Sequence, residues 1–157
     1  MFERIVLAVD SWDQAKEAVA AAVDLATKSR GEVLVVHVHD VGLASRETVD
    51  LETPFDARLL TEAALEMVTR AGVSARSELR AARSTDVATE ILRGARDFAA
   101  DTIVLGSRGL GDFAGLLLGS VAHRVIQLAD CPVVVVRAAE VTAGSHHRNE
   151  GRAATVA

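Results

Sequence analysis

Apolar residues along the chain follow two patterns, short unbroken runs and longer stretches with helical spacing. The runs and one weaker alternating segment predict strands at 4–9, 32–39, 73–79, 102–105 and 132–136. Apolar positions three and four residues apart predict a helix in each interval between strands. Because strands and helices alternate, we expect one α/β domain with a mainly parallel sheet. The expected architecture is Rossmann-like, an open five-stranded sheet in the order 3-2-1-4-5 with helices on both faces.

Local signals indicate where the first helix begins and ends. Ser11 and Gln14 match a capping box, with Ser11 as the N-cap residue. Gly31 follows Lys28–Arg30 and is a candidate for the residue that stops this helix. Residues 40–56 lack steady periodicity, so we expect a long connection near the top of the sheet.

The later helices carry similar signals. Gly72 is expected to end the second helix, and Ser84 and Thr85 are candidate caps for the third. The helical pattern after the glycine-rich segment at 106–120, which predicts the fourth helix, consists of Val121, Ala122, Val125, Ile126 and Ala129.

Length and composition suit a single globular domain. Half of the 157 residues are apolar and a quarter are charged. We expect a folded domain at 1–137 and a disordered tail at 138–157, where small and polar residues predominate. Cys131 is the only cysteine, and we find neither a secretory signal nor an apolar run of about 20 residues. These features favour a cytoplasmic protein with no membrane span.

The charge pattern argues against a nucleic-acid partner. The formal net charge is −5, and the 17 basic residues are scattered along the chain. Four phenylalanines, one tryptophan and no tyrosine leave few rings for stacking against single strands. A free nucleotide remains compatible because it needs only a local group of hydrogen-bond donors.

A glycine-rich segment after the fourth strand is the strongest functional motif. Gly106-Ser107-Arg108-Gly109 is followed, after nine residues, by Gly119-Ser120 at the start of a helical pattern. Glycines let backbone N–H groups approach an anion closely, and a helix N-terminus adds a favourable dipole. This arrangement predicts a phosphate site.

The predicted topology selects the same place. Open doubly wound sheets bind ligands where the strand order reverses, here between the first and fourth strands. The first strand ends with Ala8, Val9 and Asp10, and Asp10 would accept from ribose hydroxyls or bind a metal. Val38, near the end of the second strand, would offer its backbone groups to a base.

Each of these residues also has a purely structural interpretation. The glycines could form only a turn, Asp10 could serve the adjacent helix N-terminus, and Ser120 could only cap the fourth helix. Residues 109–114 formally satisfy a dinucleotide fingerprint, but they follow the fourth strand rather than the first. No P-loop and no nucleophile elbow is present.

The histidines and the cysteine offer weaker alternatives. His37 and His39 could share a strand face, but without a clear third ligand a structural role is favoured over a metal site. His146 and His147 could bind metals adventitiously. Cys131 is interpreted as a small packed side chain rather than a redox thiol.

Residues 2–137 resemble the universal stress protein family, specifically its nucleotide-binding branch. The resemblance rests on the spacing of Gly106, Gly109, Gly119 and Ser120, which this chain meets without gaps. Three shorter segments support it, AVDSW after the first strand, VVHVHD at the end of the second and CPVVVVR at the last.

This resemblance implies that ATP or a related adenine nucleotide binds in the crevice. Asp10 would contact the ribose, the Val38 backbone would bind adenine, and Gly106 would line the ribose. The phosphates would lie on Gly109, Gly119 and Ser120, and the expected lining also includes Ala8, Val9, Ser107, Arg108 and Val121. Trp12 departs from the family, which more often has a small residue there.

The sequence favours nucleotide binding over catalysis. Arg108 and Arg124 are the only cations near the loop, and no base other than Asp10 is evident, whereas phosphoryl transfer needs positioned cations and an oriented nucleophile. Polyphosphate charge would then require Mg²⁺ or Mn²⁺. We expect slow or no ATP hydrolysis; a weak ATPase and a nucleotide-free interaction module remain alternatives.

The last strand predicts a homodimer. Val133–Val136 would form an apolar sheet edge, and such edges tend to pair. Two copies related by a twofold axis would cover both edges, and the family resemblance also implies a homodimer.

Overall fold

Five parallel strands form one sheet in the order β3-β2-β1-β4-β5, which confirms the predicted topology. The computed structural model describes residues 1–41, 52–107 and 119–137. The strands are β1 (Arg4–Val9), β2 (Glu32–Asp40), β3 (Ser74–Ala82), β4 (Thr102–Ser107) and β5 (Val133–Arg137). The predicted tail at 138–157 lies outside the described residues.

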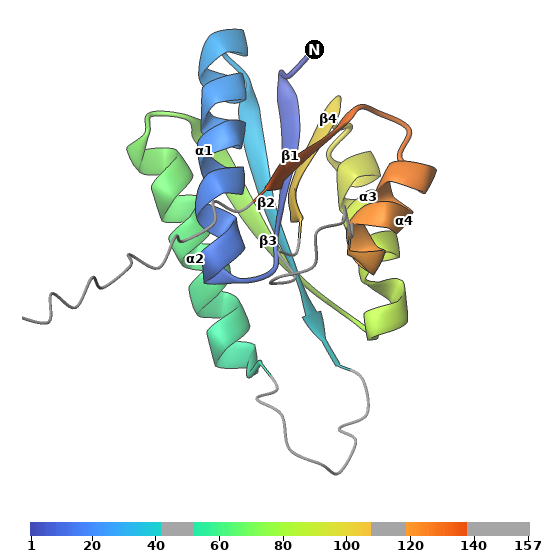
Figure 1. Cartoon of the computed structure of the whole chain (residues 1–157). Coiled ribbons are helices and arrows are strands. Elements are labelled where there is room, and N and C mark those ends of the chain that lie inside the picture. Colours follow the sequence, from blue (N-terminus) through green and yellow to red (C-terminus); the bar gives the residue numbers. More distant parts are fainter. Residues whose placement is uncertain (42–51, 108–118, 138–157) are drawn as a thin grey trace, which may run out of the picture.

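Helices cover both faces of the sheet, as Figure 1 shows. On one face lie α1 (Trp12–Ser29) and α2 (Pro54–Arg70), and on the other lie α3 (Val87–Asp97) and α4 (Ser120–Leu128). The result is a three-layer α/β domain. No helix in these described ranges is both long enough and apolar enough to cross a membrane.

Two apolar cores fill the spaces between the layers, because successive residues of a strand point to opposite faces. Ile5 and Leu7 of β1 pack toward α1 and α2, whereas Val6 packs toward α3 and α4. The three central strands are buried on both faces, which is why their sequences are unbroken apolar runs. The edge strands β3 and β5 are more exposed, as the alternation in β3 predicts.

The start of α2 corrects the predicted connection at 40–56, which was too long. Thr53 forms a capping box with Asp56, and Pro54 occupies the first turn. Hydrogen bonds from the Thr53 hydroxyl and backbone to the Asp56 carboxylate lower the pKa of Asp56. These residues are a helix start signal that the sequence interpretation took for loop.

Of two other capping predictions, the first was correct in its N-cap residue but not in the side-chain bond, and the second was wrong. Ser11 is the N-cap residue of α1, but its side chain makes no capping hydrogen bond. Ser84 and Thr85 do not cap α3; they form a single 3₁₀ turn (Ser84–Asp86) that leads into it. In both places the polar residue marks the helix start correctly, but the rotamer and the turn geometry depend on packing that the local sequence does not specify.

The helix predicted from the apolar pattern after the glycine-rich segment is α4, and not all of its apolar positions are buried. Ala122 and Val125 are buried, whereas Ile126 is 45% exposed. Ile126, the next residue after Val125, faces outward because α4 is short and contacts the sheet along only a narrow stripe.

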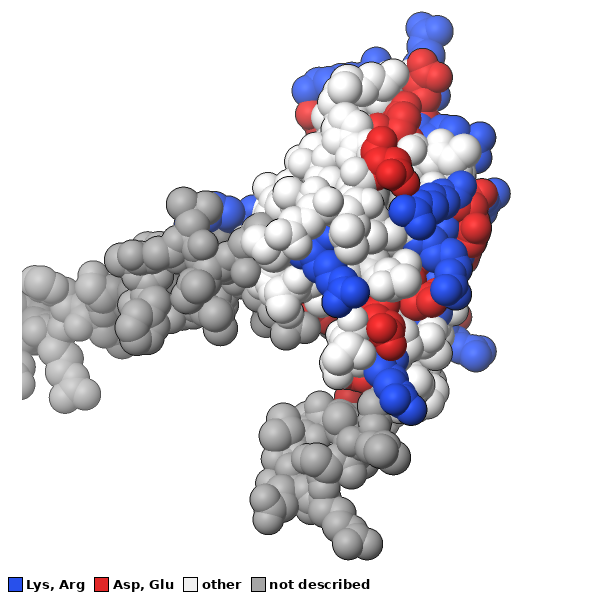
Figure 2. All heavy atoms as spheres, turned by 90° about the vertical axis from the view of Figure 1, so that its right-hand side faces the viewer, with Lys and Arg blue, Asp and Glu red and all other residues white. Residues whose placement is uncertain are grey.

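Acidic and basic side chains alternate on the side of the molecule that carries α3 and α4. Figure 2 shows Lys and Arg lying beside Asp and Glu over this side. Arg80 is hydrogen-bonded to Glu78 and Asp97 at 2.7 and 3.0 Å, and Arg96 to Asp130 at 3.0 Å. The visible face therefore carries paired charges of both signs among its described residues.

Gly31 has a role that differs from the predicted one. The left-handed residue at the end of α1 is Arg30, with φ of 56°. Gly31 is instead required for close approach, because a Cβ there would lie 2.4 Å from the carbonyl oxygen of Phe2. This contact packs the end of α1 against the chain just before β1.

Gly31→Ala is expected to destabilise the fold by about 2–3 kcal/mol, because backbone atoms must shift to admit the methyl group. This corresponds to a fall in Tm of roughly 5–10 °C in a thermal melt. Gly72→Ala is the matched control: φ is 80°, but the space around Gly72 is open, so only the backbone penalty of about 1–2 kcal/mol applies. An equal or larger loss in the Gly72 variant would contradict this role for Gly31.

Candidate functional site

A cavity of about 320 Å³ lies at the carboxyl ends of β1, β2 and β4, between the sheet and the helices α3 and α4. This is the point where the strand order reverses, as the topology predicted. Predicted site residues that line it are Ala8, Val9, Asp10, Val38, Gly106, Gly119, Ser120 and Val121. Ser107 ends β4 without lining the cavity, while Arg108 and Gly109 lie outside the described residues.

A small residue at the centre of the sheet makes room for the cavity. Ala8 is paired with Val36 of β2 on one side and with Leu105 of β4 on the other. All three line the cavity, and Ala8 is the only one of them that is not buried. The cavity wall therefore recedes at Ala8, between the larger side chains of Val36 and Leu105.

The N-terminus of α4 opens into this cavity. Gly119 is the N-cap residue, and as a glycine it has no side chain that could cap the helix. The first backbone hydrogen bond of the helix runs from the His123 N–H to the Gly119 carbonyl oxygen. Ser120, Val121 and Ala122 therefore have backbone N–H groups without a partner inside the helix. Since Ser120 is the first helical residue and not the N-cap, the reading that it only caps α4 is wrong. These donors suit an anion.

The backbone carbonyl of Val38 faces the space beyond the end of β1. Glu32 N–H donates to Glu3 on the β1 side, and Val41 N–H donates to Ala82 of β3. Because the backbone groups of a strand alternate between its two neighbours, those of Val38 point to the β1 side. Pairing of β1 with β2 stops at Val9 and His37, so the Val38 carbonyl lies just past the last pair, at the cavity.

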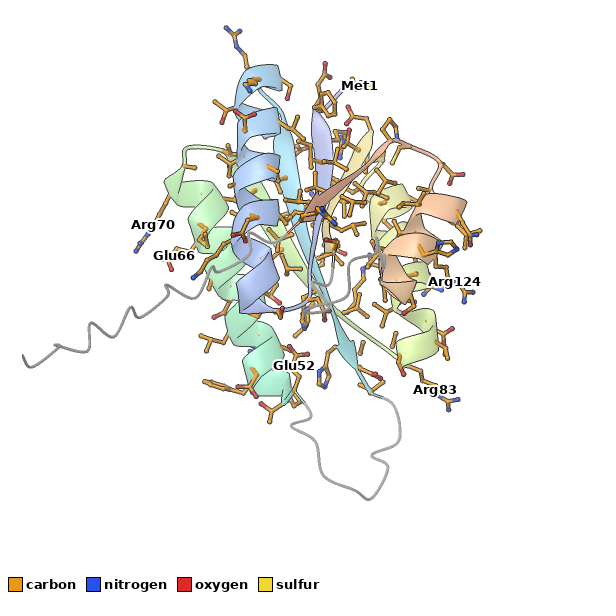
Figure 3. All side chains as sticks on the ribbon, viewed as in Figure 1. Met1, Glu52, Glu66, Arg70, Arg83 and Arg124 are labelled. Carbon is orange, nitrogen blue, oxygen red and sulfur yellow. The ribbon has the colours of Figure 1, made fainter. Side chains whose placement is uncertain are left out.

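Carboxylates line the cavity near β1 and β2. Asp10, Asp40 and Glu52 all contribute to the lining, and no Lys or Arg does so among the described residues. Figure 3 shows Glu52 at the start of α2, at the end of the sheet where the strands terminate. Arg124, a cation predicted to lie near the loop, is exposed on α4 and does not line the cavity.

Glu52 is held by the two histidines of β2. His37 Nε2 lies 2.8 and 2.9 Å from the two carboxylate oxygens, and His39 Nδ1 lies 3.2 Å from one of them. Within the described ranges, no group of three or more His, Cys, Asp or Glu side chains is arranged to hold a metal ion. The histidine pair thus serves Glu52, a partner that sequence reasoning missed.

Other lining residues were also missed because they come from a different part of the chain. Ser84 precedes α3, and Val87 and Ile91 belong to its first turns. Their apolar spacing predicts a buried helix face and gives no signal that part of this face borders a cavity. Only the packing of α3 over β2 reveals it.

The surroundings of Cys131 disfavour its reactive thiolate form. Burial raises the pKa of its thiol, and the nearby charges of Asp101 and Asp130 raise it further. A raised pKa keeps the sulfur in its unreactive thiol form near neutral pH. This agrees with its interpretation as a packed side chain at the start of β5.

The comparison with known families agrees with the glycine signature. The model of the universal stress protein family matches residues 1–137. The chain belongs to this family. It is 30% identical to the universal stress protein YxiE of Bacillus subtilis, over 87% of this chain and all of the relative. A universal stress protein of Thermus aquaticus is 34% identical, with the same coverage.

Solved universal stress proteins share the architecture. A structure from Archaeoglobus fulgidus has a TM-score of 0.71 and 26% identity, and covers 86% of this chain and 98% of its own. A second structure from that organism, solved in complex with dAMP, has a TM-score of 0.65 and 28% identity, covering 84% and 95%. Membership of the family therefore rests on both sequence and fold.

Proposed function

We propose that this universal stress protein is a cytoplasmic regulatory protein that binds ATP or a related adenine nucleotide without acting as an enzyme. The observation that carries the proposal is the N-terminus of α4, which opens without a side-chain cap into the cavity at the switch point of the sheet. This proposal also assigns the chain to the nucleotide-binding branch of its family.

The phosphates would lie on the donor-rich end of the cavity. Gly119 and Ser120 would present backbone N–H groups to them, and Gly106 would let the chain pass close to the ribose. Arg108 and Gly109 belong to the same proposed cradle by their place in the signature.

The ribose and the base would occupy the rest of the cavity. Asp10 would accept from ribose hydroxyls, and the Val38 carbonyl would accept from the adenine amine. The relative solved with dAMP supports an adenine ligand, since it is 28% identical over most of this chain. The volume of the cavity falls within the range of small-molecule sites.

A divalent cation would accompany a polyphosphate ligand. The described lining supplies carboxylate oxygens and no Lys or Arg, and Mg²⁺ and Mn²⁺ prefer oxygen ligands. Asp10 would share such an ion with the phosphates, and the ion would offset their negative charge next to the carboxylates.

Efficient hydrolysis is not expected from this lining. Phosphoryl transfer needs positioned cations that stabilise the transition state, and no Lys or Arg belongs to the described lining, whose polar side chains are carboxylates and the hydroxyls of Ser84 and Ser120. A weak ATPase remains an alternative, as does an interaction module of the same fold that carries no nucleotide.

Mass spectrometry of material released by denaturing the purified protein is expected to detect an adenine nucleotide. Mg-ATP should raise the Tm of nucleotide-free protein, because ligand binding stabilises the folded state. ATP turnover should stay far below about 1 per second, the lower end of ordinary enzymes. Absence of both bound nucleotide and thermal shift would favour the interaction module, and turnover at enzyme-like rates would refute the non-enzymatic role.

We also propose a homodimer formed through β5. Val133–Val136 are only half-buried, and β5 pairs with β4 on one side alone. Pairing of two such edges about a twofold axis would complete their hydrogen bonds and cover the valines.

A further inference from the structure

We propose that Glu52 contacts the nucleotide base and selects purines that carry an amine, rather than an oxygen, at carbon 6, with His37 and His39 as its positioning residues. This inference rests on the proposed nucleotide function and adds the base specificity of that site.

The contacts of His37 fix the carboxylate in place. His37 is 2% exposed, and its Nδ1 lies 2.8 Å from the carbonyl oxygen of Val9 while its Nε2 faces Glu52. A carbonyl accepts only, so Nδ1 donates to Val9 and the tautomer is determined. Nε2 faces the carboxylate at 2.8 Å, and this contact ties Glu52 to the end of β1.

His39 restrains the same carboxylate from a second direction. Its Nδ1 lies 3.2 Å from Oε2 of Glu52, and its side chain is 13% exposed. A carboxylate has about four lone-pair positions, and the two imidazoles make three close contacts with its oxygens, so it can still accept from one further donor. Glu52 is 31% exposed and lines the cavity, which is where that donor would come from.

The two ends of the cavity differ in a way that orients the ligand. The α4 end offers N–H donors, and the β2 end offers the carboxylates of Asp40 and Glu52. A phosphate is attracted to the first end, where the N–H groups and the dipole of α4 favour an anion. The base would then lie at the β2 end, where Val36, Val38, Val87 and Ile91 line the α3 side of the cavity and Glu52, held by the histidines from the α2 side, lines it opposite them.

The hydrogen-bond acceptors at the β2 end of the cavity favour a base whose edge carries N–H donors. The amine of adenine has two N–H groups, one for the Val38 carbonyl and one for Glu52. Inosine nucleotides have an oxygen at the same position, which would face both acceptors and leave them without a hydrogen bond. Sites built to bind an N–H group reject analogues that lack it more strongly than apolar pockets reject a change in size.

Calorimetric titration of the full chain with Mg-ATP and with Mg-ITP tests the inference. Wild type is expected to bind ATP at least 10-fold more tightly than ITP. Glu52→Gln keeps the volume and can donate to the inosine oxygen, so the ratio should fall to about 3-fold or less. Glu66→Gln, which removes an exposed carboxylate paired with Arg70 on α2, should leave the ratio unchanged.

His39→Asn tests the positioning role. It should lower the ATP-to-ITP ratio without a matching loss of Tm, a result that a purely structural histidine would not give. A wild type that binds both nucleotides equally, or a ratio unchanged in Glu52→Gln, would overturn the inference while leaving nucleotide binding intact. A wild type that binds neither nucleotide would overturn the proposed function and this inference together.

Discussion

Replacing Gly119 by valine is expected to abolish nucleotide binding, with the Kd for Mg-ATP rising at least 100-fold. Gly119 is the N-cap of α4 and lines the cavity, so a branched side chain there would occupy the space where a phosphate must meet the helix N-terminus. Its φ of −57° and ψ of 152° are open to any residue, so valine introduces no backbone strain. Calorimetric titration measures the affinity.

Two measurements separate a lost site from a lost fold. The Tm of the nucleotide-free variant should change by only a few degrees, as expected for about 1 kcal/mol at a helix N-cap. Ser120→Ala keeps the backbone donors and should weaken binding by about 10-fold at most, the effect of one hydrogen bond. Full affinity in Gly119→Val would place the nucleotide elsewhere.

Val135→Pro is expected to convert a dimer into a folded monomer. Ile103 N–H donates to Pro132, so backbone groups at even-numbered positions of β5 face β4, and those of Val133 and Val135 face the open edge. Proline at an outward position removes one edge donor without breaking the ladder to β4. Light scattering at micromolar concentration measures the mass.

Val134→Pro is the matched control because its N–H faces β4. It should lower the Tm much more than Val135→Pro, since it removes a hydrogen bond inside the sheet. A wild type that is monomeric at micromolar concentration, or a Val135→Pro variant that remains dimeric, would refute the β5 interface.

The sequence was most informative about features that follow from the α/β architecture itself. The central strands were predicted within a few residues because burial on both faces requires unbroken apolar runs. The α/β class followed from the alternation of strands and helices, and the expected strand order is the one that the structure shows. Asp10, Val38 and Gly119 were predicted to share one site because strand ends and helix starts meet at the switch point.

Contacts between distant segments could not be predicted. Gly31 has the sequence context of a helix stop, yet its requirement comes from the Phe2 carbonyl, which lies near it only in the folded chain. Glu52 occurs in a stretch without periodicity, and nothing around it indicates that two histidines of β2 hold it. The roles of such positions depend on how distant segments pack in the folded chain, which local sequence patterns do not specify.

The recess at Ala8 has a consequence for the lifetime of the chain in a cell. A larger side chain there would fill the space and add apolar contacts, so the empty protein gives up some stability that its core could have. A ligand present at one hundred times its Kd would restore about 2.7 kcal/mol. Because proteases degrade chains that unfold, the abundance of this protein would then rise and fall with the supply of its ligand.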